Sequence, residues 1–422
     1  MVCYRLLFVL FLAFCPLGSR PAAAAPDTFA IVNVRIFDGK KMVPKRTVVV
    51  KDGRITAVGG PKLKPPKGAE VINGSGATLL PGFIDAHTHT YGPALERALV
   101  FGVTTELDMF TDPGWARDLR NEQAATGAPG RADMRSAGLL ATAPGGHGTQ
   151  FGIQVLPLSR PEEAQAWVDG RLAEGSDYIK IVSEDGAAYG GQRSALDHAT
   201  VAALIEAAHR RSRRAVVHVS TQERAMAALE AGADGLVHIF VDEAPEPDFA
   251  PLAARKKAFV VPTLSLSESA AGVASGWSLT EDPRLAPYLT ADEVANLRRS
   301  FSTLPGAPQR LEHAFAAVRQ LRAAKVPILA GSDAPNPGTT HGASLHREME
   351  MLVAAGLKPV EALAAATSAP AKAFGLDDRG RIVRGLRADL VLVRGNPGQD
   401  VTATRDILRI WKAGRPVERP SS

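Results

Sequence analysis

The sequence has 422 residues, of which 45% are hydrophobic and 22% are charged, and its formal net charge at pH 7 is +5. This is the composition of a globular protein and excludes a disordered, collagen-like or coiled-coil chain. The length accommodates a barrel of about 250 residues and a smaller second domain. The basic residues are scattered or lie beside helical stretches without interleaved aromatic residues, so we expect no nucleic-acid partner.

Residues 1–25 have the order of a signal peptide. Arg5 precedes the apolar run 6–14, and the small residues 22–25 follow in the pattern of a cleavage site. The apolar run is shorter than the roughly 20 residues that span a bilayer. We therefore expect cleavage, a periplasmic or secreted mature protein, and no stable membrane insertion.

Both cysteines, Cys3 and Cys15, lie inside this leader. The mature chain would then have neither a disulfide nor a thiolate metal ligand, so any metal would be held by His, carboxylate or Lys side chains. Lipidation at Cys15 is the alternative to simple cleavage, although the bulky Phe14 before it disfavours this.

The two ends of the mature chain have the same character. Residues 26–81 alternate apolar and polar positions between turns such as Asp38-Gly39, which predicts short antiparallel strands. Residues 377–422 repeat this pattern. We expect both ends to form one small β-sandwich domain.

The middle of the chain, residues 82–376, alternates short runs rich in Val and Ile with longer Ala-rich runs, which is typical of an α/β fold of the (β/α)8 TIM-barrel type. The eight expected strands lie at 82–89, 103–109, 134–141, 178–184, 215–220, 235–240, 259–266 and 326–333. The Gly-, Ser- and Pro-rich stretch 270–308 is expected to be a loop that overhangs the C-terminal face of the barrel, where such enzymes keep their active sites.

Residues able to bind a metal recur at the expected strand ends. In the first strand, the alternation of side chains points His87 and His89 to the same side. A barrel brings the ends of its strands together at one face, so groups far apart in sequence converge there. The alternative, a pair of histidines on a surface loop, does not explain the later strand ends. The six candidate ligands are His87, His89, Lys180, His218, His238 and Asp333.

Three further residues are candidates for supporting roles. His147, in a Gly-rich loop after the third strand, and His341, beyond the eighth, are tentative substrate contacts. A simple turn and a helix cap are the respective alternatives. Asp108, at the end of the second strand, is a candidate hydrogen-bond partner for a metal-binding histidine.

These motifs resemble the amidohydrolase superfamily over almost all of the mature chain. The resemblance rests on HTH after PGFIDA, on the strand Lys180, on His218 and His238, and on the Asp of GSDAP. The phrases GGHG and THGASLHRE are similar to those of imidazolonepropionase-like and Xaa-Pro dipeptidase-like members.

The resemblance implies a site with two divalent metal ions, with zinc as the default, although the same ligands accept manganese, cobalt, nickel or iron. His87, His89 and Asp333 would bind one ion, and His218 and His238 the second. Lys180 would bridge both as a CO2-derived carbamate, because a plain ammonium would be repelled by two cations. A role as a salt-bridge partner is its alternative. The metals would activate a shared water as hydroxide, and Asp333 would act as general base and then as general acid.

The expected function is the hydrolysis of amide-like C–N bonds in a small-molecule or peptide-like substrate, such as a dipeptide or an N-acyl amino acid. A phosphotriesterase or lactonase with the same metal site is the first alternative. A non-catalytic barrel scaffold is the second, and a full set of six ligand-type residues argues against it. A homo-oligomer is one option for the assembly.

Overall fold

The structure is a computed structural model that describes residues 28–273, 276–301 and 307–420. The expected signal peptide, residues 1–25, lies outside this range together with Cys3 and Cys15. Within the described part of the chain, no helix is both long enough and apolar enough to cross a membrane.

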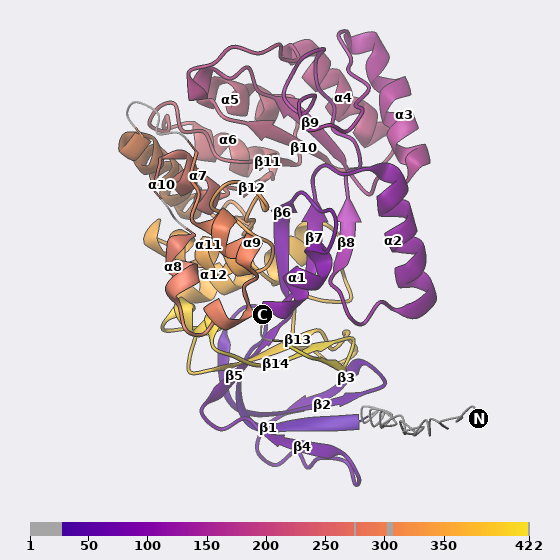
Figure 1. The fold of residues 1–422 in the computed structure, drawn as a ribbon, viewed down its shortest axis with the longest axis vertical. Helices are drawn as coiled ribbons and strands as arrows, with labels where there is room; N and C mark the ends of the chain where they lie inside the picture. Colours follow the sequence, from indigo (N-terminus) through magenta and orange to yellow (C-terminus); the bar gives the residue numbers. More distant parts are fainter. Residues whose placement is uncertain (1–27, 274–275, 302–306, 421–422) are drawn as a thin grey trace, which may run out of the picture.

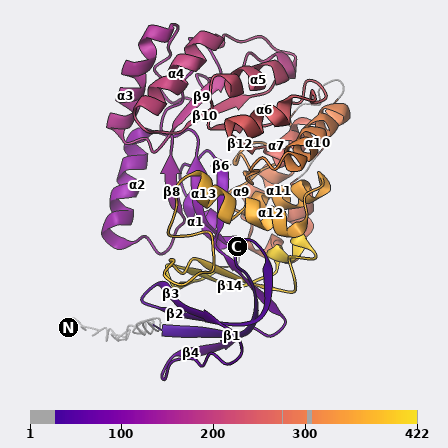
Figure 2. The same ribbon diagram turned by 180° about the vertical axis from the view of Figure 1, so that it is seen from behind.

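Strands from both chain ends form one eight-stranded sheet, which lies at one end of the molecule (Figures 1 and 2). Its order is β15-β14-β13-β5-β1-β2-β3, and β4 pairs with β1. The two ends meet where β13 pairs antiparallel with β5, with Leu390 opposite Pro81. The strands are β1 (Thr28–Phe37), β2 (Met42–Lys51), β3 (Arg54–Gly59), β4 (Glu70–Asn73), β5 (Ala77–Pro81), β13 (Leu390–Arg394), β14 (Ile407–Lys412) and β15 (Arg415–Val417).

This terminal sheet curls over on itself. The rings of Phe29 in β1 and Trp411 in β14 stack with their centroids 5.3 Å apart, although β5 and β13 lie between their strands in the sheet. In a flat sheet, β1 and β14 would be three strand spacings apart, so the two rings would be separated by about 14 Å. Apolar residues of both chain ends thus share one core.

Two parallel sheets form the middle of the molecule. The first has the order β6-β7-β8 and the second β12-β11-β10-β9. An isolated parallel bridge between Ala141 and Ile181 joins the segment after β8 to β9. Two more, Val260 with Ile328 and Thr88 with Ala334, join β12 to β6 through residues 328–334. The strands are β6 (Phe83–Thr88), β7 (Val103–Asp108), β8 (Asp133–Ser136), β9 (Ile179–Ser183), β10 (Ala215–Val219), β11 (Gly235–Val237) and β12 (Phe259–Val261).

Seven of the eight expected strand segments contain a strand, but residues 326–333 make only one isolated bridge, between Ile328 and Val260. The backbone leaves the extended conformation at Asp333, whose φ is 53°. Gly331 allows this segment to approach β6 and β12 closely, because a Cβ there would lie 2.9 Å from the Cβ of His87 and 2.5 Å from the side chain of Val261. The expected strand 259–266 is also shortened, since Leu264 begins a helix.

Helices alternate with the parallel strands, and α4 and α5 pack directly against β9, β10 and β11 (Figure 1). Capping residues in the sequence set where helices begin. Asp197, for example, caps α4 by accepting a hydrogen bond from Thr200 N at 2.7 Å. The helices are α1 (Ala94–Val100), α2 (Pro113–Thr126), α3 (Ala164–Glu174), α4 (His198–Arg210), α5 (Gln222–Glu230), α6 (Phe249–Lys256), α7 (Leu264–Ala270), α8 (Trp277–Glu281), α9 (Ala291–Leu297), α10 (Ala307–Ala323), α11 (Ala343–Ala354), α12 (Pro359–Ala365) and α13 (Ser368–Ala373). The described residues also contain four 3-10 turns, namely η1 (Pro161–Glu163), η2 (Ala187–Tyr189), η3 (Ala286–Tyr288) and η4 (Val401–Arg405).

The expectation of one long loop at 270–308 is wrong, because this stretch contains α8, η3 and α9. Its buried Leu279 and Leu297 pack with Phe101 at the end of α1, and Arg97 of α1 forms an ion pair with Glu293 at 2.7 Å. Burial of these leucines favours helices on the flank of the molecule over an extended overhang.

The interior of the parallel strands is apolar at their N-terminal ends. The ring of Phe374, just after α13, lies 5.0 Å from Tyr178 before β9 and 5.3 Å from Phe259 at the start of β12. This aromatic cluster fills the interior at the N-terminal ends of the strands.

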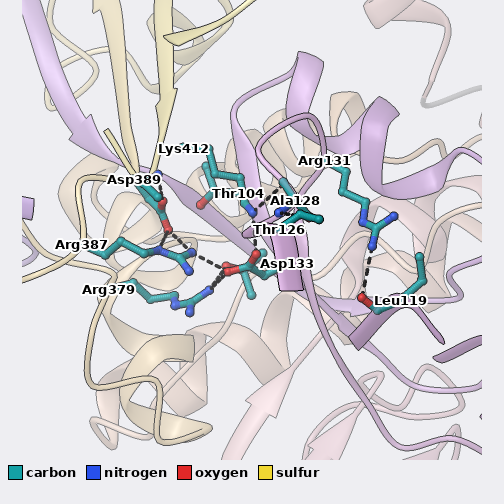
Figure 3. A network of polar contacts seen from close by, with 12 residues as sticks. Thr104, Leu119, Thr126, Ala128, Arg131, Asp133, Arg379, Arg387, Asp389 and Lys412 are labelled. Atoms are coloured by element: carbon teal, nitrogen blue, oxygen red, sulfur yellow. Dashed lines mark hydrogen bonds and ion pairs between the residues drawn. The ribbon is translucent and has the colours of Figure 1, made fainter. Parts of the chain in front are cut away.

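A buried ionic network joins β8 to the C-terminal segment (Figure 3). Asp133, the first residue of β8, contacts Arg379 at 2.6 Å, Arg387 at 2.5 Å and Lys412 at 2.5 Å. Burial alone would raise the pKa of Asp133, but the charges of Arg387, Lys412 and Arg379 hold it well below its usual range. The network thereby fixes the terminal sheet to the parallel strands.

Candidate metal centre

Asp333 and the histidines of the first strand meet at the C-terminal end of β6. His87 lies in β6 and is fully buried, and His89 follows the strand by one residue. The Nε2 atoms of His87 and His89 lie 3.3 Å and 3.0 Å from Asp333 Oδ1. The alternation of side chains along β6 turns both imidazoles to one side, as the sequence indicates.

His218 and His238 come to the same place from the next sheet. Their rings are 4.3 Å apart, and the ring of His238 is 4.7 Å from that of His87. His238 Nε2 lies 3.9 Å from Asp333 Oδ2. One ligand atom from each of His87, His238 and Asp333 lies within 4.8 Å of the other two, so these residues form a group that could hold a metal ion.

The backbone is strained where it presents these groups. His238 has a φ of 65°, Asp333 of 53° and Thr263, just after β12, of 49°. Residues other than glycine rarely adopt this left-handed conformation, which costs about 1–3 kcal/mol and gathers at functional sites. Three residues therefore adopt an unfavourable backbone conformation at the point where the candidate ligands meet.

Lys180 lies in β9 and is 1% exposed, and its Nζ has no hydrogen-bond partner among the described residues. Burial lowers the pKa of Lys180 to about 7, with opposing contributions from Asp333 and Asp108. Burial therefore favours the uncharged form of this amine.

Burial favours the uncharged form of the histidines at this site. Burial lowers the pKa values of His87, His218 and His238 well below the usual range. Burial alone would raise the pKa of Asp333, but His238 and His89 hold it below its usual value. Neutral imidazoles and an ionised carboxylate are the forms that bind divalent metals.

The donor set fits metal ions because many of its polar atoms are buried without a partner. Burying such an atom unpaired costs about 1–3 kcal/mol, and a bound cation would satisfy several at once. Among the described residues, the buried atoms here without a hydrogen bond are His87 Nδ1 and Nε2, His89 Nδ1, Lys180 Nζ, Glu184 Oε2 and Asp333 Oδ1.

Of the two tentative substrate contacts, His147 lies at this site. Its ring is 4.9 Å from that of His218 and 5.6 Å from that of Phe151. Burial lowers the pKa of His147 to about 4, so near pH 7 it is neutral and offers a hydrogen bond instead of a positive charge.

His341 and Asp108 make contacts other than the expected ones. His341 is buried beside β7, where its Nδ1 lies 2.9 Å from Glu106 Oε1, so a role in substrate binding stays a prediction. Asp108 accepts hydrogen bonds from Thr90 N at 2.8 Å and Ser136 Oγ at 2.5 Å. It therefore holds the backbone that follows His89.

Sequence reasoning missed the hollow beside His238. Tyr189, Thr263 and Arg310 are its larger polar lining residues, and the apolar part includes Leu266 and Leu311. The guanidinium of Arg310 in α10 donates a hydrogen bond to Ala188 O. A search confined to strand ends could not find this arginine, because it reaches the site from a helix.

The chain belongs to the amidohydrolase family, whose model matches residues 158–417. Members of this family typically depend on metals, and the buried His/Asp group is consistent with that. The family and the imidazolonepropionase relatives together support a hydrolase that acts on C–N bonds.

The chain is similar to imidazolonepropionase from Cereibacter sphaeroides, with 27% identity over 398 residues that cover 85% of this chain and 92% of the relative. The Deinococcus radiodurans imidazolonepropionase is 26% identical over 86% of this chain and 89% of the relative. Among solved structures, a putative prolidase from Bifidobacterium longum has a TM-score of 0.73 and 26% identity, covering 94% of this chain and 95% of that one. A Xaa-Pro dipeptidase with bound methionine has a TM-score of 0.74 and 22% identity, covering 93% of this chain and all of that one.

Proposed function

We propose that this protein is an exported hydrolase with two divalent metal ions, which cleaves amide-like C–N bonds in substrates that carry a carboxylate, such as dipeptides or N-acyl amino acids. The observation that carries the proposal is the convergence of His87, His238 and Asp333, with buried unpartnered atoms around them. The putative prolidase from Bifidobacterium longum, at 26% identity, supports a peptide-like substrate.

The proposed fold is a closed (β/α)8 barrel with a β-sandwich built from both chain ends. The isolated bridges through residues 328–334 support closure, and the stacking of Phe29 on Trp411 supports the sandwich. The proposed domains are the signal peptide 1–25, the sandwich from 26–81 and 377–422, and the barrel 82–376. Export rests on the order of charged, apolar and small residues in the leader.

One ion would be held by His87, His89 and Asp333 and the second by His218 and His238, with a carbamate on Lys180 between them. Such ions, with zinc as the default, supply Lewis acidity for the scissile carbonyl and lower the pKa of water. The chain itself handles the protons. Asp333 is ionised and buried, so it can accept a proton from the attacking water and return it to the leaving nitrogen.

The hollow beside His238 accounts for the choice of substrate. Arg310 can form a charge-assisted hydrogen bond with a carboxylate, and Leu266 and Leu311 can pack against an apolar side chain. His147 is neutral near pH 7, so it is suited to donate a hydrogen bond to the carbonyl oxygen as negative charge develops there.

The test combines elemental analysis of the purified mature protein with a panel of N-acyl amino acids, dipeptides, lactones and phosphotriesters, before and after chelation. We expect close to two metals per chain and chelator-sensitive cleavage of the substrates with a free carboxylate. Turnover of lactones or phosphotriesters alone would instead identify the protein as a lactonase or phosphotriesterase. Absence of both metal and turnover after reconstitution with zinc, manganese and bicarbonate would leave a non-catalytic barrel.

A further inference from the structure

Glu184 is a buried carboxylate at the metal centre that the six candidate ligands do not include. It follows β9 directly and is 3% exposed. Its Oε1 accepts a hydrogen bond from Gly186 N at 2.5 Å, which fixes the direction of the side chain. Its Oε2 has no hydrogen-bond partner among the described residues and lies 3.8 Å from His218 Nε2.

The position of Glu184 in the chain explains why it reaches the centre. Side chains alternate along a strand, so Glu184 and Lys180, four residues apart, point to the same side. In the paired strand β10, His218 lies opposite Val182, between these two positions. Glu184 therefore lies on the same side of β9 as Lys180, and nearer to the C-terminal ends of the strands.

Glu184 has no strongly basic partner within the described part of the chain. It lies within ion-pair distance of His218, at 3.8 Å, but of no Lys or Arg side chain among those residues. The neighbouring Arg224 pairs with Asp185 at 2.9 Å. A buried carboxylate without a Lys or Arg partner is costly, so this oxygen is suited to receive a positive charge that binds from outside.

The separation of the two side chains is compatible with a shared ion. Ligand atoms at about 2.0–2.2 Å from zinc can lie at most about 4.4 Å apart. Glu184 Oε2 and His218 Nε2 are within that limit at 3.8 Å. Hydrogen bonding cannot explain this arrangement, because 3.8 Å is too long for it.

We infer that Glu184 is a further metal ligand, whose Oε2 binds the same divalent ion as His218. This inference rests on the proposed metal-dependent function. It adds a fixed negative charge to the half of the centre that otherwise relies on neutral imidazoles and on the carbamate of Lys180.

The test compares the wild-type protein with Glu184→Gln and with the control Asp185→Asn. Glutamine keeps the acceptor for Gly186 N but loses the negative charge, and Asp185 is the next carboxylate in the chain and pairs with Arg224 instead. After chelation and dialysis against graded zinc concentrations, bound zinc is measured by elemental analysis, and melting temperatures are recorded with and without zinc.

We expect wild type and Asp185→Asn to bind two zinc ions. Glu184→Gln should bind one as before and the other at least about tenfold more weakly. Without zinc its melting temperature should equal or exceed that of wild type, because an unpaired buried charge is gone, and the increase on adding zinc should be smaller. Glu184→Asp, which withdraws the carboxylate, should also weaken one ion, and it replaces the glutamine variant if the latter fails to fold.

Two zinc ions bound with wild-type affinity by Glu184→Gln and by Glu184→Asp would overturn the inference while leaving the proposed function intact. A lower melting temperature of the zinc-free Glu184→Gln protein, with unchanged zinc binding, would assign Glu184 to holding the loop at Gly186. A wild-type protein that binds no zinc or other divalent metal would instead remove the proposed function itself.

Discussion

His238 Nδ1 lies 2.7 Å from the hydroxyl oxygen of Thr263. This contact directs the other ring nitrogen of His238 toward Asp333, at 3.9 Å. Both His238 and Thr263 have a left-handed backbone, so two strained strand ends are linked through one hydrogen bond. Such a partner behind a metal-binding imidazole fixes its orientation and its tautomer.

Replacing Thr263 by valine should therefore weaken metal binding without removing any ligand. Valine keeps the shape but loses the hydroxyl, and we expect a loss of metal affinity of about 10- to 100-fold, measured by zinc titration of the chelated protein. Thr263→Ser should retain wild-type affinity because it keeps the hydroxyl. Equal affinities in all three proteins would show that the hydrogen bond does not orient His238.

Asp333→Asn should separate metal binding from catalysis. Asparagine keeps an oxygen near His87 and His89 but cannot accept a proton. We expect a metal content close to that of wild type and a kcat lower by about 10²–10⁴-fold. Elemental analysis and steady-state kinetics on the same preparation measure both effects, and wild-type kcat in this variant would exclude Asp333 as the general base.

Lys180→Ala should lose the bridge between the two ions. The side chain is buried with its Nζ unpartnered, so its removal leaves a space that a short carboxylic acid can occupy. We expect the metal content to fall and to recover in part with added acetate or propionate. Lys180→Met fills the space and should not respond to either acid. Unchanged metal stoichiometry in Lys180→Ala would contradict the bridging role.

Asp133→Asn should destabilise the fold, because Arg379, Arg387 and Lys412 would lose their shared carboxylate. Breaking such a buried network costs about 3–5 kcal/mol. The folded protein holds the pKa of Asp133 below the value of about 3.9 in an unfolded chain. Its stabilisation is therefore complete above that value and is lost as the pH falls toward the folded pKa.

Urea unfolding at several pH values measures this effect. The difference between wild type and Asp133→Asn should be constant from pH 5 to 7 and should shrink below about pH 4. The control Asp169→Asn breaks the exposed pair with Arg211 and should leave the urea midpoint almost unchanged. A difference that grows as the pH falls would contradict this account of Asp133.

The candidate ligands that lie on strands could be singled out from the sequence for a local reason. His87, Lys180 and His218 lie within strands whose alternation decides the side to which each points. The order of the strands along the chain then decides which end of the sheet they share.

Short repeating patterns in the amino-acid sequence are enough to predict seven of the eight parallel strand segments, their order, and the candidate ligands at their ends. The contact of Thr263 with His238, the place of Glu184 beside His218, and the approach of Arg310 from α10 become visible only in the folded chain. Each of these depends on a left-handed backbone or on packing between segments far apart in sequence, and neither leaves a local periodic signal in the chain.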